Sequence, residues 1–111
     1  MTIWHDGIEI NNCLQIISHR GHRVRFRHRV KFNLAKHLIL DVFNREELFM
    51  LLYGHQEDGG PEIGTTHISV LMSQMRPVLT MLGLTLRKEK GAHYWTRYHL
   101  VPTVSQIAEA A

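Results

Sequence analysis

The chain has 111 residues, of which 44% are hydrophobic and 21% are charged. This length fits a single domain, and the composition supports a buried core rather than a disordered chain. Apolar runs fall well short of the roughly 18 residues that span a bilayer, and a single cysteine, Cys13, excludes an intrachain disulfide. We therefore expect one cytoplasmic domain, residues 1–102, that folds without a metal or disulfide, and a short tail at 103–111.

The net charge of +3 is too small to indicate a partner, but the charges are unevenly placed along the chain. Residues 19–31 hold six lysines and arginines, three histidines and no acid. Residues 41–62 hold six acids and only one basic residue, Arg45, and basic residues again dominate from Arg76 onward. Such a division of charge indicates a binding partner rather than a particular fold.

Short strands are predicted over residues 8–27. Residues 8–10 alternate apolar and polar side chains, residues 14–17 form a short apolar run, and Gly21 marks a turn. Val24 and Phe26 then alternate with arginines, which separates an apolar face from a basic one. The pattern predicts a small antiparallel sheet with one solvent-exposed, basic face.

A helical period replaces this alternation near residue 30. A first helix over residues 30–43 is indicated by an apolar stripe at four-residue spacing: Val30, Leu34, Leu38 and Val42. Asn44 and Glu47 have the spacing of a capping box and predict a second helix over residues 45–54, ending at Gly54. The core-facing residues expected in this helix are Leu48, Leu51 and Leu52.

A third helix is predicted over residues 65–82, after a polar stretch at 55–64. Its apolar stripe consists of Ile68, Leu71, Met72, Met75 and Leu79. Pro77 lies inside this stripe and is expected to kink the helix or to end it near Arg76. Beyond Gly83, residues 84–100 predict a β-hairpin that turns around Lys90-Gly91.

Four stretches resemble, in order and spacing, the effector domain of OmpR/PhoB-type transcriptional regulators over roughly residues 8–100. They are Ser18–Phe26, Asn44–Leu48, His67–Leu71 and Lys90–Tyr94. The resemblance implies an α+β fold, a winged helix-turn-helix with a small N-terminal antiparallel sheet, three helices and a C-terminal β-hairpin wing. It also implies a sequence-specific, double-stranded DNA-binding transcriptional regulator of bacterial or phage type, here without the receiver domain of the family.

In a helix-turn-helix protein the recognition helix lies in the major groove, where its outward side chains meet base edges. The outward residues expected on the third helix are Thr65, Thr66, Ser69, Val70, Ser73 and Arg76. The wing residues expected to contact the backbone or minor groove are Arg87, Lys88, Lys90 and His93. The chain departs from the family pattern because Val70, Met72 and Ser73 occupy positions that are usually basic, and because His93 replaces the second wing glycine.

The alternative function is a protein-interaction module on the same fold, which the uncharged outward face of the third helix favours. Two surfaces could bind RNA polymerase, another regulator or a second copy of the chain. They are the arginines of the sheet, Arg23, Arg25 and Arg27, and the acidic loop residues Glu57, Asp58 and Glu62. The arginines could equally form a solvated face that protects a sheet edge from aggregation.

No stretch of the sequence has the pattern of a catalytic or cofactor site. We find no P-loop, nucleophile elbow or H-E-x-x-H motif, and the nine histidines are scattered without a metal-binding spacing. We therefore expect no enzyme activity, no cofactor and no metal site.

Overall fold

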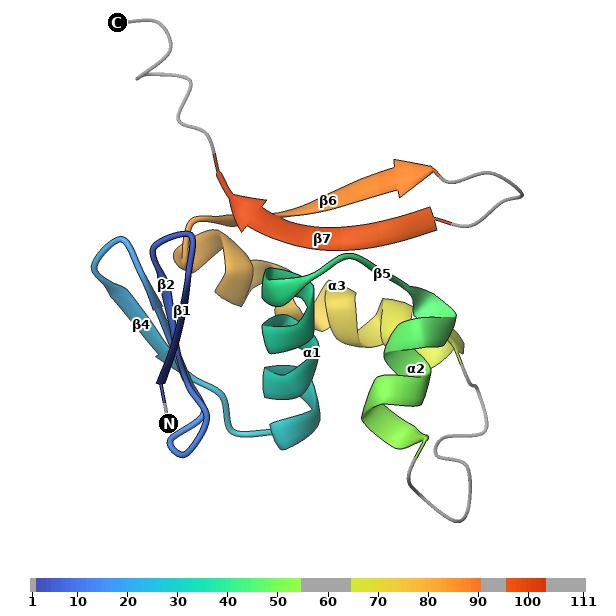
Figure 1. The fold of residues 1–111 in the computed structure, drawn as a ribbon, viewed down its shortest axis with the longest axis horizontal. Helices are drawn as coiled ribbons and strands as arrows, with labels where there is room; N and C mark the ends of the chain where they lie inside the picture. The colour runs from blue at the N-terminus through green and yellow to red at the C-terminus, as the bar shows by residue number, and fades with distance from the viewer. Residues whose placement is uncertain (1, 55–64, 91–95, 104–111) are drawn as a thin grey trace, which may run out of the picture.

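The fold comes from a computed structural model that describes residues 2–54, 65–90 and 96–103, without the side chains of residues 65 and 90. These residues form three helices and two antiparallel sheets, one of four strands and one of three (Figure 1). The coarse prediction of an α+β fold is therefore confirmed. No helix in the described ranges is both long and apolar enough to cross a membrane.

The N-terminal sheet contains four sequential strands: β1 (Thr2–His5), β2 (Ile8–Asn11), β3 (Ile16–His19) and β4 (His22–Arg25). Two-residue turns, Asp6-Gly7 and Arg20-Gly21, join the outer pairs, and all four turn residues have positive φ between 49° and 80°. Paired positive φ angles are typical of the tight hairpin turn that matches strand twist. The sequence predicts a sheet that begins at residue 8, so β1 is an addition.

The strand register separates the two faces of this sheet as expected. Ile10 pairs with Ile17, and Ile17 pairs with Val24, so these apolar side chains share the inner face. Arg23 and Arg25 lie on the outer face and are exposed. The basic face of β4 therefore points away from the core.

Helix α1 (Arg29–Leu40) ends earlier than the predicted residue 43. The backbone of Asp41 is extended, and the Asp41 carboxylate accepts a hydrogen bond of 2.7 Å from the Val42 amide, so Val42 lies outside the helix. Phe43 and Asn44 instead form a short strand, β5 (Phe43–Asn44), whose pairing with a distant strand replaces the last helical turn.

Helix α2 (Arg45–Tyr53) begins at its predicted capping box. The Asn44 side chain accepts from the Glu47 amide at 2.8 Å, and the Glu47 carboxylate accepts from the Asn44 amide at 3.0 Å. Gly54 caps the other end, as predicted. Leu48 and Leu52 are buried, but Leu51 is 43% exposed, so the prediction that it faces the core is wrong. The reason is its position beside the stripe that Leu48, Leu52 and Tyr53 form.

Helix α3 (Thr65–Met81) passes through Pro77 without interruption. Of the two predicted outcomes, a kink or an end near Arg76, the end is therefore wrong, and the helix runs to within one residue of the predicted residue 82. Pro77 is exposed, so the Ser73 carbonyl that loses its helical donor lies on the solvent side. Leu79 and Leu82 are buried just beyond the proline, and their packing favours continuation of the chain's helical path. The chain turns at Gly83, whose φ of 69° suits glycine.

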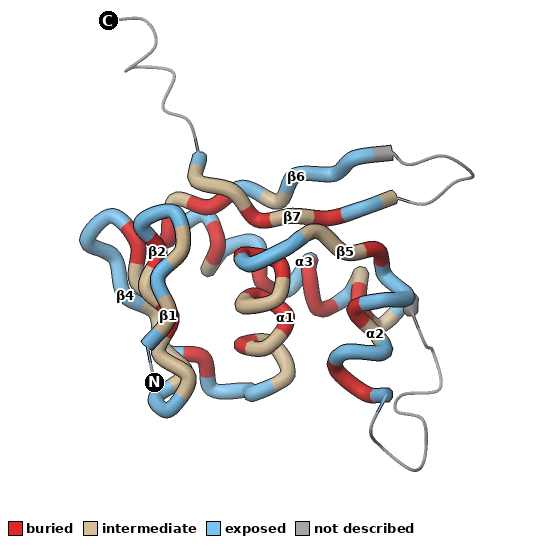
Figure 2. The backbone as a smooth tube through the Cα atoms, in the orientation of Figure 1, coloured by how far each residue is buried: buried red, intermediate tan, exposed pale blue. Residues whose placement is uncertain are grey.

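The second sheet has the order β5-β7-β6, with β6 (Leu84–Lys90) and β7 (Thr96–Pro102) forming the predicted hairpin. Its β7 strand packs on α1, and β6 packs on α3. Figure 1 shows α1 between the N-terminal sheet and α2, with the second sheet lying across the helices. Buried positions in Figure 2 gather where these elements face one another, in one continuous core.

Candidate nucleic-acid interface

One long face of α3 is uncovered by other described elements. Its opposite face carries the predicted apolar stripe, in which every residue is at most 6% exposed: Ile68, Leu71, Met72, Met75 and Leu79. Helical spacing then turns Thr66, Val70, Ser73 and Arg76 outward, and all four are exposed. These four predicted residues share one surface. For Thr65, the helix backbone is described but the side chain is not.

Ser69, also predicted to face outward, hydrogen bonds to a neighbouring helix. It is partly buried at the flank of this surface, where its hydroxyl accepts a hydrogen bond of 3.2 Å from the Arg45 guanidinium. The contact places an arginine of α2 beside the outward face of α3. Arg45 is not among the predicted site residues, and only its position directly after the capping residue Asn44 could have suggested a fixed location.

Two sets of contacts constrain the backbone at Arg45, the first residue of α2. The capping box fixes the first helical turn, in which Arg45 is the first residue. Asn44 is also paired with Arg97 of β7, so this turn is attached to the second sheet. Because the backbone at Arg45 is constrained by both contacts, its guanidinium can reach only a limited region next to α3.

The far end of α2 is fastened to the beginning of α3. The Tyr53 hydroxyl and His67 Nε2 are 3.0 Å apart, and their ring centroids are 5.8 Å apart. Burial raises the pKa of the Tyr53 hydroxyl above its ordinary value, so this hydroxyl stays protonated to a higher pH than an exposed tyrosine does. The two ends of α2 are thus each hydrogen bonded to the beginning of α3, at Ser69 and His67.

A groove of about 250 Å³ lies between α3 and β6. Arg76 and Thr80 line its helix side, while Leu84, Leu86 and Lys88 are among the residues on its strand side. The groove therefore brings the most C-terminal of the predicted base-reading residues next to one of the predicted wing residues. Arg76 and Lys88 make no ion pair with any other described side chain.

Arg87 and Lys88 point to opposite faces of the wing hairpin. Lys88 pairs with the buried Tyr98, on the face that also carries the buried Leu84 and meets the helices. Arg87 pairs with His99 on the other face. Alternation along the strand thus assigns Lys88, and not Arg87, to the side of α3. The Lys90 side chain and His93 lie outside the described part.

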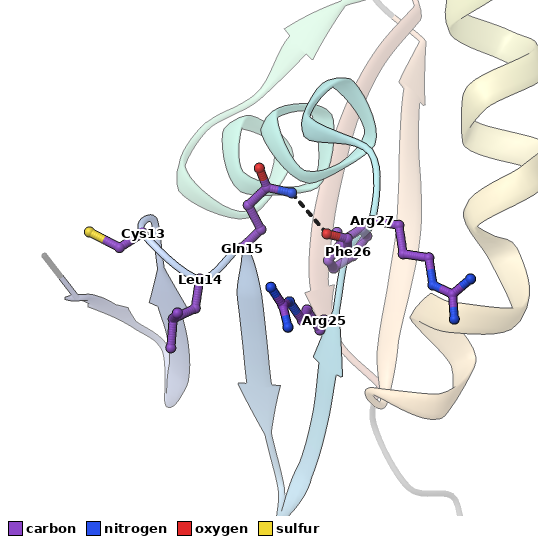
Figure 3. A pocket seen from close by; sticks show the side chains of 6 residues that line it. All are labelled: Cys13, Leu14, Gln15, Arg25, Phe26 and Arg27. Carbon is purple, nitrogen blue, oxygen red and sulfur yellow. Dashed lines mark hydrogen bonds between the residues drawn. The ribbon is translucent and has the colours of Figure 1, made fainter.

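The predicted partner surfaces are only partly described. Arg23 and Arg25 share the outer face of the N-terminal sheet, whereas Arg27 lies beyond β4 in the connection to α1. Figure 3 shows the Arg25 and Arg27 side chains pointing in different directions. The acidic loop residues Glu57, Asp58 and Glu62 lie outside the described residues, so the structure does not place them relative to the arginines.

The described ranges hold no cluster of metal-ligating side chains. They contain no group of three or more histidine, cysteine, aspartate or glutamate side chains arranged to hold a metal ion. No protein-family model matches the chain, and no curated protein matches it in sequence. The interpretation of the interface therefore rests on its geometry and chemistry.

Proposed function

We propose that this protein is a sequence-specific, double-stranded DNA-binding transcriptional regulator with a winged helix-turn-helix. In this proposal α3 lies in the major groove, and the β6–β7 hairpin is the wing that contacts the backbone or minor groove. The observation that carries it is the uncovered face of α3, bordered by two cations from other elements, Arg45 and Lys88, that have no anionic partner among the described residues. The order of sheet, three helices and hairpin supports the resemblance to OmpR/PhoB-type effector domains.

The dimensions and chemistry of α3 suit a major groove. The groove of B-DNA is about 12 Å wide and admits one helix. Arg76 has the geometry to bond guanine in bidentate fashion, while the Val70 side chain can contact a thymine methyl. Thr66 and Ser73 offer hydroxyls to bases or phosphates. Because this face carries few charges, affinity would depend on the flanking cations and sequence preference on α3.

Two copies on adjacent half-sites would give the affinity that one module lacks. A single small module buries only about 600–1,000 Å² of protein surface on DNA. A second copy adds binding energy without any new contact within each module. We therefore propose a homodimeric arrangement on DNA, with RNA polymerase as a further partner in transcription.

The proposal is tested by selecting duplexes from a random library and titrating the selected duplex with variants. We expect Arg76→Ala to cost about 1–3 kcal/mol in binding and to relax preference at one base position. Lys88→Ala should weaken all duplexes alike and lower the slope of log K against log salt by about one unit. Arg87→Ala is the matched control, since it removes the same charge from the opposite face of the wing.

A double variant, Arg76→Ala with Lys88→Ala, that still binds the selected duplex with wild-type affinity would exclude this face as the DNA interface. Equal losses for Arg87→Ala and Lys88→Ala would indicate a general charge effect rather than a contact from the groove between α3 and β6.

A further inference from the structure

The outer face of the N-terminal sheet is a second surface that no other described element covers. Its inner face packs into the core through residues such as Ile10 and Ile17, so the alternate residues point away from the helices. The register aligns these outward residues in two neighbouring rows across the strands. One row is Trp4, Glu9, Ser18 and Arg23, and the other is Thr2, Asn11, Ile16 and Arg25.

The cations of this face have no anionic partner among the described residues. Arg23 and Arg25 are both exposed on the edge strand β4. The one ion pair of the described chain joins His5 and Asp6, at 3.4 Å. Glu9 lies on the same face but two strands from Arg23, a separation of about 10 Å. Both guanidinium groups are therefore available for bidentate contacts with external carboxylates.

The same face carries large exposed apolar side chains. Trp4 is 67% exposed, and Leu14, in the turn between β2 and β3, is 52% exposed. Ile16, the register partner of Arg25, is partly exposed between them. The charged phosphate groups of DNA would not favour contact with these apolar side chains. Tryptophan and arginine together are instead the residue types that dominate the binding energy of protein–protein interfaces.

Two hollows mark where a partner would fit. One, of about 330 Å³, has Trp4, Ser18 and Arg23 in its lining. The Ser18 hydroxyl oxygen is buried and has no hydrogen-bond partner among the residues that the structure describes, and such a buried group costs stability unless a bound group satisfies it. The other, of about 690 Å³, has Leu14, Gln15, Arg25 and Arg27 among its lining residues (Figure 3).

The wall of the second hollow is held in shape by hydrogen bonds. The Gln15 side-chain amide donates to the Phe26 carbonyl, and the Phe26 amide donates to the Gln15 carbonyl, both at 2.8 Å. The Gln15 side-chain oxygen accepts from Arg29 at 3.2 Å. Because these contacts link the β2–β3 turn to the start of α1, Leu14 and Arg25 face a preformed hollow rather than a loop that must order on binding.

We propose that this outer face is a docking surface for an acidic protein segment that also carries apolar side chains. Arg23 and Arg25 bind its carboxylates, Trp4, Leu14 and Ile16 cover its apolar side chains, and the Ser18 hydroxyl bonds to its backbone. The surface is separate from α3 and the wing, so it serves a protein partner while the other face remains free for DNA.

Three labelled peptides test this proposal by fluorescence anisotropy with the full chain. In the first, glutamates alternate with leucines; in the second, glutamates alternate with serines; in the third, lysines alternate with leucines. We expect the first to bind most tightly, the second more weakly because it lacks apolar contacts, and the third not at all. Arg25→Glu should weaken the binding of the first peptide roughly tenfold or more. Trp4→Ala should reduce the difference in affinity between the first and the second peptide.

Arg87→Glu is the matched control, because it reverses the same charge on the exposed face of the wing, where it lines neither hollow. Equal losses for Arg25→Glu and Arg87→Glu, or equal binding of the first two peptides, would overturn the proposal. All these variants change exposed residues, and circular dichroism is the check that each is folded. If Arg25→Glu instead weakens duplex DNA as strongly as Lys88→Ala does, the surface belongs to the DNA interface and the proposal is wrong, whereas the proposed DNA-binding function stands.

Discussion

The position of the Arg45 side chain depends on a tertiary contact. It is exposed, and its guanidinium is oriented toward α3 by the 3.2 Å hydrogen bond to the Ser69 hydroxyl. An arginine held in this way loses less conformational freedom when it binds a phosphate than a freely rotating side chain does. In the proposed interface, this single hydrogen bond would orient the Arg45 guanidinium for a phosphate contact.

We expect Arg45→Ala to weaken binding to all duplexes and to lower the salt slope by about one unit, since one phosphate contact is lost. Ser69→Ala should reduce affinity less and leave the slope unchanged, because the charge remains but its orientation is lost. Titrations at several salt concentrations distinguish the two variants. A slope that is unchanged in Arg45→Ala would show that this arginine does not contact phosphate.

His37 gives the stability of the fold a defined pH dependence. Burial, and secondarily the charge of Lys36, holds the pKa of His37 below the usual value of 6.5. The unfolded chain therefore takes up a proton near pH 6.5 that the folded chain resists. Stability is unaffected by this group above that pH, and it falls as the pH decreases until the folded-state pKa is reached.

His37→Gln should accordingly flatten the loss of stability that sets in as the pH falls below 6.5. The measurement is the free energy of unfolding by urea at a series of pH values. His22→Gln, at the exposed start of β4, is the control and should leave the pH dependence of the wild type intact. An unchanged pH dependence in His37→Gln would assign the effect to other groups.

At the scale of elements, local patterns predict the long segments well. Apolar periodicity locates α2 and α3 within one residue, and the capping box identifies the first residue of α2. The strands β1 and β5 are not predicted from the sequence, for different reasons. β1 has only four residues, although Asp6-Gly7 is an available turn signal. β5 has two residues and exists only because Phe43 and Asn44 pair with β7, which no local pattern contains.

Pro77 lies inside α3, although the sequence predicts that it kinks or ends the helix. It lies on the exposed side of α3, where it removes one backbone donor without disturbing the buried stripe. Pro77→Ala restores the bond to the Ser73 carbonyl and should raise the free energy of unfolding by about 1–3 kcal/mol in urea titrations. Thr80→Ala, also exposed on α3, should change it by less than about 0.5 kcal/mol. A less stable Pro77→Ala protein would mean that the rigidity of proline in the unfolded chain outweighs the lost hydrogen bond.

At the scale of the whole molecule, the candidate interface is predictable only in part. Helical spacing alone turns Thr66, Val70 and Arg76 outward, because one buried stripe determines the opposite face. The contribution of Arg45 and the assignment of Arg87 and Lys88 to opposite faces depend on helix packing and strand register. Helix packing and strand register both depend on contacts between residues far apart in sequence, so the spacing of residues along the chain does not predict them.

The N-terminal sheet and the proposed DNA-binding half are joined by a buried contact. His19 of β3 is only 6% exposed, and its Nδ1 lies 2.6 Å from the Leu82 carbonyl, just before the turn from α3 into β6. A Cβ atom at Gly83 would lie 3.5 Å from the Arg20 side chain, which shows how closely the β3–β4 turn meets this corner. The two halves therefore share one core and should unfold together.

His19→Ala leaves the Leu82 carbonyl buried without its partner and should lower the free energy of unfolding by about 1–3 kcal/mol. His22→Ala is the matched control, because His22 is the register partner of His19 but is exposed. Urea unfolding followed by far-ultraviolet circular dichroism and by tryptophan fluorescence should give coincident transitions in both variants, shifted to lower urea only in His19→Ala. Separate transitions in the wild type would show instead that the N-terminal sheet is an independent folding unit. A protein bound to the proposed docking surface could then not influence the proposed DNA-binding half through a shared core.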